Sequence, residues 1–171
     1  MGRGRRRGAA AAQNAVGPAQ SPTDGPAPPV APAVVTRDES GRARVRAIPL
    51  SEPLRVDGRL DEAVYRDVPS VSDFVQQVPR ERAPATERTE AWVMFDSSTL
   101  YISARCWDSA PPRQWIANEL RRDTNQLRQN DTFGVILDTF HDRRNGFLFY
   151  TNPLGARAEQ AVTDEGTLNP D

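Results

Sequence analysis

Residues Asn130–Asn152 read NDTFGVILDTFHDRRNGFLFYTN, and this stretch decides the fold class. Within it, Phe133–Asp138 and Phe147–Asn152 both alternate, so that every second residue shares one face of an extended strand. A polar turn separates the two halves and ends in Asn145 and Gly146. Alternating residues on either side of an Asn-Gly dipeptide are the strongest short-range signal of a β-hairpin. The chain is therefore expected to be an antiparallel β protein.

Further alternating segments extend the sheet on both sides of this hairpin. Thr89–Asp96 and Leu100–Trp107 alternate around a tight turn, and Gly155–Val162 predicts one more strand. The last residues, Gly166–Asp171, have the composition of a loop. Gln114–Arg122 fits a strand or a helical turn, and its periodicity does not separate the two.

The part of the chain before these strands predicts only short elements. Ile48–Leu50 and Leu54–Val56 are expected as edge strands, because Pro49 and Pro53 interrupt them. Asp61 is expected to cap a short helical turn that follows it, over residues 62–67. Short strands with hardly any helix predict an all-β fold, an antiparallel β-sandwich of jelly-roll or immunoglobulin-like type.

The chain has 171 residues and divides into two regions by composition. Residues 1–46 are rich in Ala, Pro, Gly and Arg and are expected to be a disordered tail, because they cannot bury enough apolar surface to offset the entropy of ordering. The basic start of this tail also resembles a degraded export signal, although Ala9–Ala12 is short for its apolar part. Residues 47–171 are expected to form the sandwich.

Composition excludes several classes of function. The formal net charge is −1, and all 22 basic residues are Arg, so lysine chemistry such as Schiff-base formation is absent. Acidic residues interspersed among the arginines argue against a nucleic-acid partner. Cys106, the single cysteine, is expected to be buried and inert, and His141, the single histidine, lies in the hairpin turn. No apolar run approaches the roughly 20 residues of a transmembrane helix.

Several runs of the chain, taken in order, resemble a known family. They are LRVDGRLDEAVY, Thr86–Glu90, FDSSTLYISARCWD, an RRD tripeptide and NDTFGVILDTFHDRRNGFLFYTNPLG. Their order and spacing resemble family 9 carbohydrate-binding modules, in the version found at the N-terminus of bacterial surface proteins that continue into an outer-membrane-barrel-like region. The resemblance covers about Ile48–Asp171. It implies a jelly-roll-like sandwich that binds saccharides by aromatic stacking, with structural calcium in some members.

Two departures from the family pattern affect this interpretation. Tyr65 stands where the family usually has Trp, which keeps an aromatic plug for the core. The chain ends at Asn169–Asp171, before the last strands of such a sandwich, so we expect the sandwich to be truncated at its C-terminus. The resemblance also implies an exported protein, in the periplasm or at the cell surface, with the barrel-like region as a further partner.

Aromatic side chains carry the prediction of a binding site. Trp107 and Trp115 flank the Pro-Pro loop, where binding residues often lie on such scaffolds, and they are expected to stack on a polysaccharide or oligosaccharide. Arg105 and Asn152 are expected to hydrogen-bond its hydroxyl groups. Trp92, inside a strand, is better explained as core packing.

Other chemistries receive less support from the sequence. No catalytic residue and no metal ligand are assigned, because the acidic residues near the hairpin have turn positions and no EF-hand spacing. Structural calcium stays open as a cofactor. Haem binding is poorly supported, because axial ligands are scarce. The expected function is non-catalytic carbohydrate binding linked to carbohydrate catabolism; the alternative is the N-terminal part of a glycoside hydrolase or other surface hydrolase.

Overall fold

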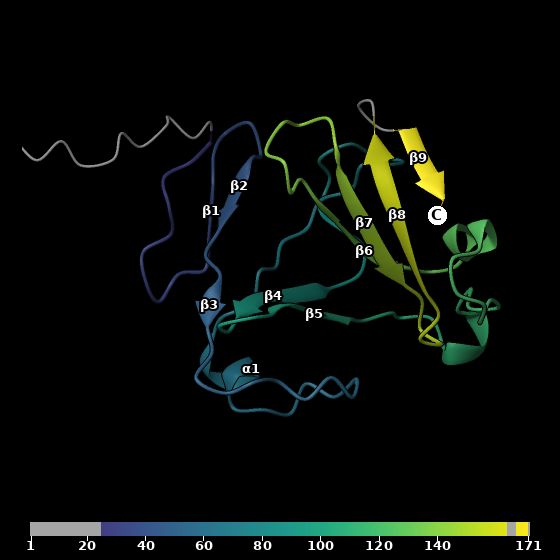
Figure 1. Cartoon of the computed structure of the whole chain (residues 1–171), viewed down its shortest axis with the longest axis horizontal. Helices are drawn as coiled ribbons and strands as arrows, with labels where there is room; N and C mark the ends of the chain where they lie inside the picture. The colour runs from purple at the N-terminus through teal and green to yellow at the C-terminus, as the bar shows by residue number, and fades with distance from the viewer. Residues whose placement is uncertain (1–24, 164–166, 171) are drawn as a thin grey trace, which may run out of the picture.

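The structure is a computed structural model that describes residues 25–163 and 167–170. Its strands form three sheets, one of two strands (β1-β2), one of three (β3-β4-β5) and one of four (β6-β7-β8-β9), as Figure 1 shows. The elements are β1 (Val35–Arg37), β2 (Ala43–Val45), β3 (Ile48–Pro49), α1 (Val64–Asp67), β4 (Thr89–Phe95), β5 (Leu100–Cys106), η1 (Pro112–Gln114), η2 (Asn125–Gln129), β6 (Phe133–Leu137), β7 (Gly146–Thr151), β8 (Arg157–Thr163) and β9 (Thr167–Pro170).

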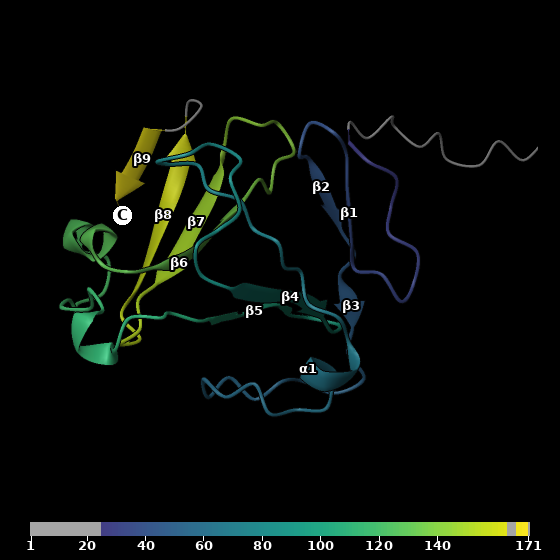
Figure 2. The same ribbon diagram turned by 180° about the vertical axis from the view of Figure 1, so that it is seen from behind.

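The described chain is nearly all β, which confirms the predicted fold class. The sandwich of jelly-roll or immunoglobulin-like type stays a prediction. Figures 1 and 2 show β4 and β5 running across the direction of β7 and β8. No helix in the described ranges has the length and apolar character required to cross a membrane.

The hairpin predicted from Asn130–Asn152 is present as β6 and β7, which pair antiparallel with Val135 opposite Phe149. Gly146 begins β7 because the sheet leaves no room there for a side chain. A Cβ atom at this position would lie 2.4 Å from the backbone oxygen of Leu137. The Asn-Gly signal is therefore explained by a close backbone approach at the end of the turn.

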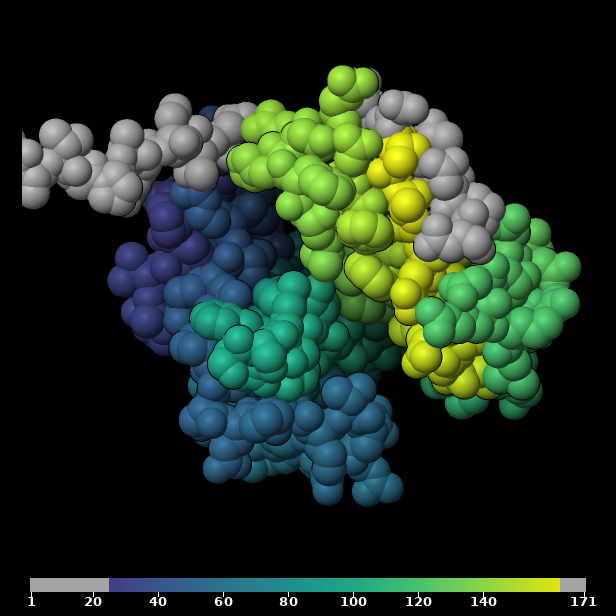
Figure 3. Space-filling model, in the orientation of Figure 1, coloured from purple at the N-terminus to yellow at the C-terminus, as the bar shows by residue number. Residues whose placement is uncertain are grey.

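One face of the four-stranded sheet carries its core. Tyr150 of β7 and Ala158 of β8 are buried there against Leu127 of η2, which is fully buried. Phe149 alternates to the opposite face, and 38% of it is exposed. Near this second face a cavity of about 210 Å³ extends toward β5 and is lined by Ile102, Phe133, Val135 and Phe149, among others. Figure 3 shows a hollow between the blue and teal atoms of the first half of the chain and the green and yellow atoms of the second.

The three-stranded sheet buries its aromatic residue against α1. Trp92 of β4 is 4% exposed, and its indole Nε1 donates to the carbonyl of Val68 at 3.1 Å. Tyr65 of α1 meets the Trp92 ring edge-on, with the ring centroids 5.3 Å apart. The Tyr65 hydroxyl also shares a 2.8 Å hydrogen bond with Ser103 of β5. The core role predicted for Trp92 and the plug role of Tyr65 are confirmed by these contacts.

The structure differs from the sequence predictions in its N-terminal part. β1 and β2 form a hairpin within the region predicted to be a disordered tail. Asp38 explains this difference, because its carboxylate accepts hydrogen bonds from the backbone N–H groups of Ser40 and Arg42 and so forms the turn locally. The predicted export-signal segment, within residues 1–24, lies outside the described residues.

Several smaller predictions were also wrong. Asp61 does not cap α1, which begins at Val64 after Ala63 without a side-chain cap. Leu54–Val56 forms no strand, and the predicted C-terminal loop contains β9, paired with β8. Cys106 is exposed rather than buried, because it pairs with Thr89 at the last position of the β4–β5 ladder.

Candidate functional site

The four predicted binding residues lie in three separate surroundings. Arg105 and Trp107 are neighbours at the end of β5. Trp115 follows η1, where its indole Nε1 donates to the carbonyl of Ala110 at 3.1 Å. Within the described ranges, Trp115 makes no ring contact with Trp107. Asn152 follows β7 and is buried.

Arg105 and Trp107 belong to a stack of alternating guanidinium groups and indole rings. Arg88 lies over the Trp107 ring at 4.5 Å from its centroid. Arg105 lies 5.8 Å from the centroids of both Trp107 and Trp92. The stack follows from the register, because Arg105 is opposite Glu90 and the N–H of Trp107 donates to the carbonyl of Arg88 at 2.9 Å. Period-2 alternation then puts these side chains on one face of the sheet.

Glu90 joins the two guanidinium groups of this stack. Its carboxylate forms an ion pair with Arg88 and lies 3.8 Å from Nη1 of Arg105. Arg105 also donates to the carbonyl of Leu60 at 3.2 Å. Arg88 and Arg105 are thus held in place by a carboxylate and by aromatic faces, which leaves the indole of Trp107 partly covered by cations.

A cavity of about 800 Å³ lies beside the stack, and Arg88 and Glu90 belong to both. It opens because the pairing of the two flanking segments is interrupted. Val71 pairs with Ala91 and Val75 pairs with Pro84, which leaves unequal numbers of residues between these two bridges. The longer segment must bow outward, and the space between the segments becomes the cavity.

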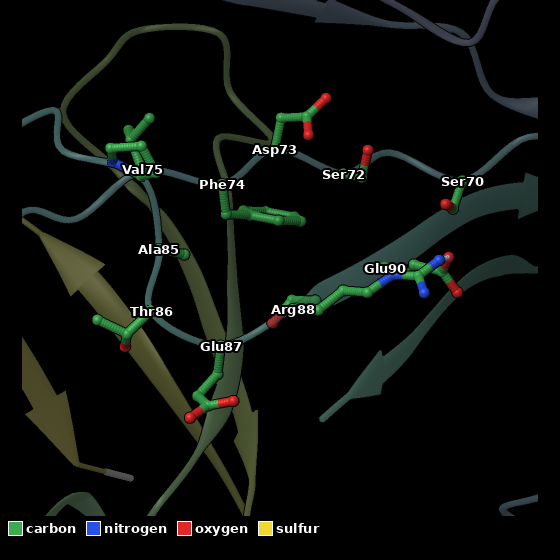
Figure 4. A pocket seen from close by; sticks show the side chains of 12 residues that line it. Ser70, Ser72, Asp73, Phe74, Val75, Ala85, Thr86, Glu87, Arg88 and Glu90 are labelled. Carbon is green, nitrogen blue, oxygen red and sulfur yellow. Dashed lines mark hydrogen bonds and ion pairs between the residues drawn. The ribbon is translucent and has the colours of Figure 1, made fainter. Parts of the chain in front are cut away.

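Phe74 supplies the aromatic surface of this cavity. Its ring projects between the two segments, as Figure 4 shows, and 37% of the residue is exposed. The other walls carry hydroxyl, carboxylate and guanidinium groups. The polar lining residues are Ser70, Ser72, Asp73, Thr86, Glu87, Arg88, Thr89 and Glu90.

Asn152 is part of a buried polar network and not of an open site. Its Nδ2 donates to the carbonyl of Glu119 at 2.8 Å and to Oδ1 of Asn130 at 3.1 Å. Its Oδ1 accepts from the backbone N–H groups of Leu154 and Ala156. These four bonds occupy both N–H donors and the oxygen of the Asn152 amide. Since only 5% of the residue is exposed, its side chain cannot contact a sugar in this structure.

The same network holds the most perturbed carboxylate of the described chain. The Arg121 guanidinium donates to both oxygens of Glu119, and the backbone N–H groups of Arg121 and Leu120 donate to one of them. These bonds lower the pKa of Glu119 to about 2. Glu119 is 7% exposed, so its charge serves the network and not a solvent-facing site.

No group of three or more His, Cys, Asp or Glu residues that could hold a metal ion occurs in the described ranges. The turn carboxylates instead bind their own backbone: Asp138 accepts from the N–H groups of Asp142 and Arg143.

Phe74, Arg88 and Glu90 were missed by sequence reasoning. Glu90 lies within β4 and Arg88 directly precedes it, so the alternation of this strand, extended by one residue, identifies both as sharing a face with Trp92. Phe74 carries no periodic signal, because the cavity depends on a pairing between segments distant in sequence. Comparison of the chain with family models, with curated proteins and with solved structures finds no match.

Proposed function

We propose that the cavity between residues 70–75 and 84–90 binds an oligosaccharide or a polysaccharide without catalysis. The observation that carries the proposal is the Phe74 ring, which projects into an open cavity whose other walls combine hydroxyl, carboxylate and guanidinium groups with the apolar residues Val75, Pro84 and Ala85. Sugar recognition requires this combination, because the C–H faces of a pyranose pack on a flat ring while its hydroxyl groups need donors and acceptors. Hydroxyl, carboxylate and guanidinium groups supply both kinds of partner.

The size of the cavity favours an oligosaccharide segment over a single sugar. About 800 Å³ falls within the range of roughly 300–1,000 Å³ that is usual for pockets holding drug-sized ligands. The open shape suits a chain that enters and leaves the site. This proposal agrees with the resemblance to carbohydrate-binding modules. From that resemblance alone we also propose an exported protein, in the periplasm or at the cell surface, with a barrel-like region as a further partner.

The proposal changes the roles of the residues predicted from sequence. Phe74 replaces the tryptophans as the stacking surface. Trp107 positions Arg88 at the cavity wall through the 4.5 Å stack, and Arg105 supports Glu90 from the other side. Trp115 and Asn152 have no part in the cavity, whose lining does not include them.

The hydrolase alternative is less well supported at this cavity. Hydrolysis of a glycosidic bond requires two carboxyl groups that face each other across the sugar. Figure 4 shows Asp73 and Glu87 on opposite sides of the Phe74 ring, with their carboxylates directed apart. Glu90 is held by two arginines, and Glu87 accepts hydrogen bonds from the N–H and hydroxyl of Ser109.

Titration with xylo- and cello-oligosaccharides tests the proposal, with tryptophan fluorescence as the readout because Trp107 contacts the cavity wall through Arg88. We expect a saturable change in the wild type and its loss in Phe74→Ala. Phe74→Leu keeps apolar volume without a flat ring and is expected to bind weakly. Phe140→Ala removes a 66% exposed aromatic residue outside the cavity lining and serves as the matched control.

Two results would overturn the proposal. One is a fluorescence signal that no oligosaccharide of the panel changes. The other is equal loss of binding in Phe74→Ala and Phe140→Ala, with circular dichroism confirming that both variants are folded. Release of reducing sugar that Asp73→Asn abolishes would favour the hydrolase alternative.

A further inference from the structure

The outer side of β6 is unpaired within the described ranges. The order of the four-stranded sheet is β6-β7-β8-β9, so β6 lies at one edge and pairs only with β7 (Figure 1). No backbone hydrogen bond or isolated bridge joins Phe133–Leu137 to any other described segment. A row of backbone N–H and C=O groups along β6 is therefore available to a further strand.

β6 also lacks the residues that protect the other edge strands of the described chain. Charged side chains and prolines on an edge strand discourage its pairing with another chain. Each of the other edge strands carries one such residue: Arg37 in β1, Arg44 in β2, Pro49 in β3, Arg105 in β5 and Pro170 in β9. The sequence of β6 is FGVIL, without a charge or a proline. This edge therefore differs from the others in having no barrier to strand addition.

The sequence of β6 is complementary to a second copy of itself. In antiparallel pairing about a two-fold axis at Val135, Gly134 of one copy lies opposite Ile136 of the other, and Phe133 lies opposite Leu137. The position without a side chain thus meets the large, exposed Ile136 side chain. On the other face, Val135 meets Val135 of the second copy. Since Val135 already pairs with the partly exposed Phe149 of β7, an apolar row becomes continuous across both copies.

We propose that the chain forms a two-fold symmetric dimer through β6, in which the four-stranded sheets of two copies join into one continuous sheet. A second copy is the occupant because two-fold pairing matches every position of β6 with an apolar residue or glycine. The formal net charge of −1 adds little repulsion between the copies. A contact limited to one strand edge belongs to the small interfaces, below about 1,200 Å², so we expect a dissociation constant of roughly 10–100 µM. β6 does not line the cavity around Phe74, and the dimer is therefore independent of the proposed sugar binding.

Sedimentation velocity of the full chain tests the proposal, from about 1 to 500 µM, a range that includes the affinity expected for an interface of this size. We expect the wild type to pass from monomer to dimer over this range. Ile136→Lys is expected to weaken dimerisation by about tenfold or more, because it introduces a charge at the edge. The substitution keeps the packing of the single chain, since 64% of Ile136 is exposed. Val56→Lys, at a 90% exposed position outside the strands, is the matched control and should dimerise like the wild type.

A charge exchange at position 136 tests the register of the pairing. Across a two-fold axis at Val135, the side chains at position 136 of the two copies are diagonal neighbours, roughly 7–8 Å apart and within reach of long side chains. Ile136→Glu alone is expected to weaken dimerisation as Ile136→Lys does. An equimolar mixture of the two variants is expected to dimerise more tightly than either variant alone, because opposite charges then face each other. Association through a surface remote from β6 does not produce this recovery.

Four results overturn the proposal. The first is a wild type that stays monomeric over the whole range, and this result does not depend on any variant folding. The second is undiminished dimerisation of a folded Ile136→Lys variant, checked by circular dichroism, because association then uses another surface. The third is growth of the wild type into assemblies larger than a dimer, since a two-fold interface occupies the edge of β6 and closes. The fourth is a mixture of the two charged variants that dimerises no more tightly than either variant alone.

Discussion

The guanidinium of Arg88 lies 4.5 Å from the ring centroid of Trp107, and the backbone of the same two residues is joined by a 2.9 Å hydrogen bond. This pair connects the end of the β4–β5 ladder with the wall of the cavity. Trp107, which was expected to stack on a sugar, thus has the guanidinium of Arg88 over its ring. Arg88, and not Trp107, lines the cavity.

Replacing Arg88 by alanine removes the stack and the ion pair with Glu90 and should lower the free energy of unfolding by about 1 kcal/mol. The loss is modest because the Arg88 side chain is 66% exposed. Arg88→Lys keeps the charge without the planar stack and should give an intermediate loss. The emission of Trp107 should change in both variants. Urea unfolding measures the loss, with the exposed Arg80→Ala as control. A variant Arg88→Ala with unchanged emission would contradict the stack.

Asn152→Ala should destabilise the protein by about 2–4 kcal/mol, because it leaves buried donors and acceptors of the network without partners. The amide joins Glu119, 33 positions earlier in the chain, to the turn after β7. Gln77→Ala removes an exposed amide and should change stability by about 0.5 kcal/mol or less. Chemical denaturation measures the free energy of unfolding of both variants. Equal losses in Asn152→Ala and Gln77→Ala would show that the buried network does not contribute to stability.

Because the pKa of Glu119 is lowered in the folded protein, the free energy of unfolding should depend on pH in the acidic range. The pKa is about 2 in the folded protein, through hydrogen bonds from Arg121 first, and about 4.3 in the unfolded chain. The ionised carboxylate therefore stabilises the fold above about pH 4.3, and this contribution is lost as the pH falls through 2. Glu119→Gln should show a shallower decline over this window. Its unfolding free energy is measured against pH beside the wild type, and parallel curves would count against the assignment.

Gly146→Ala should cost about 1–3 kcal/mol, because the new Cβ would lie 2.4 Å from the backbone oxygen of Leu137 and the strands must move apart. Gly134→Ala, in the facing strand, meets its nearest atom at 3.1 Å and should cost less. The melting temperatures of both variants show which substitution destabilises the protein more. Equal melting temperatures for Gly146→Ala and the wild type would contradict the close approach.

The fold class was predictable because period-2 alternation and turn residues are local signals. β4 to β8 follow the predicted segments closely, and Trp92 is buried as expected. Cys106 shows where the pattern fails: alternation assigns a residue to a face, but the coverage of that face depends on where the ladder ends. β1 and β2 were missed because their turn depends on the side-chain bonds of Asp38 and not on apolar burial.

The sequence by itself determined that the chain forms antiparallel strands, and it brought Arg105 and Trp107 to one strand end, because strand geometry is set by neighbours two residues apart. Only the tertiary structure decided which side chains are available. It places Asn152 in a buried network, covers Trp107 with Arg88 and opens a cavity around Phe74, because each of these depends on pairing between segments far apart in the chain.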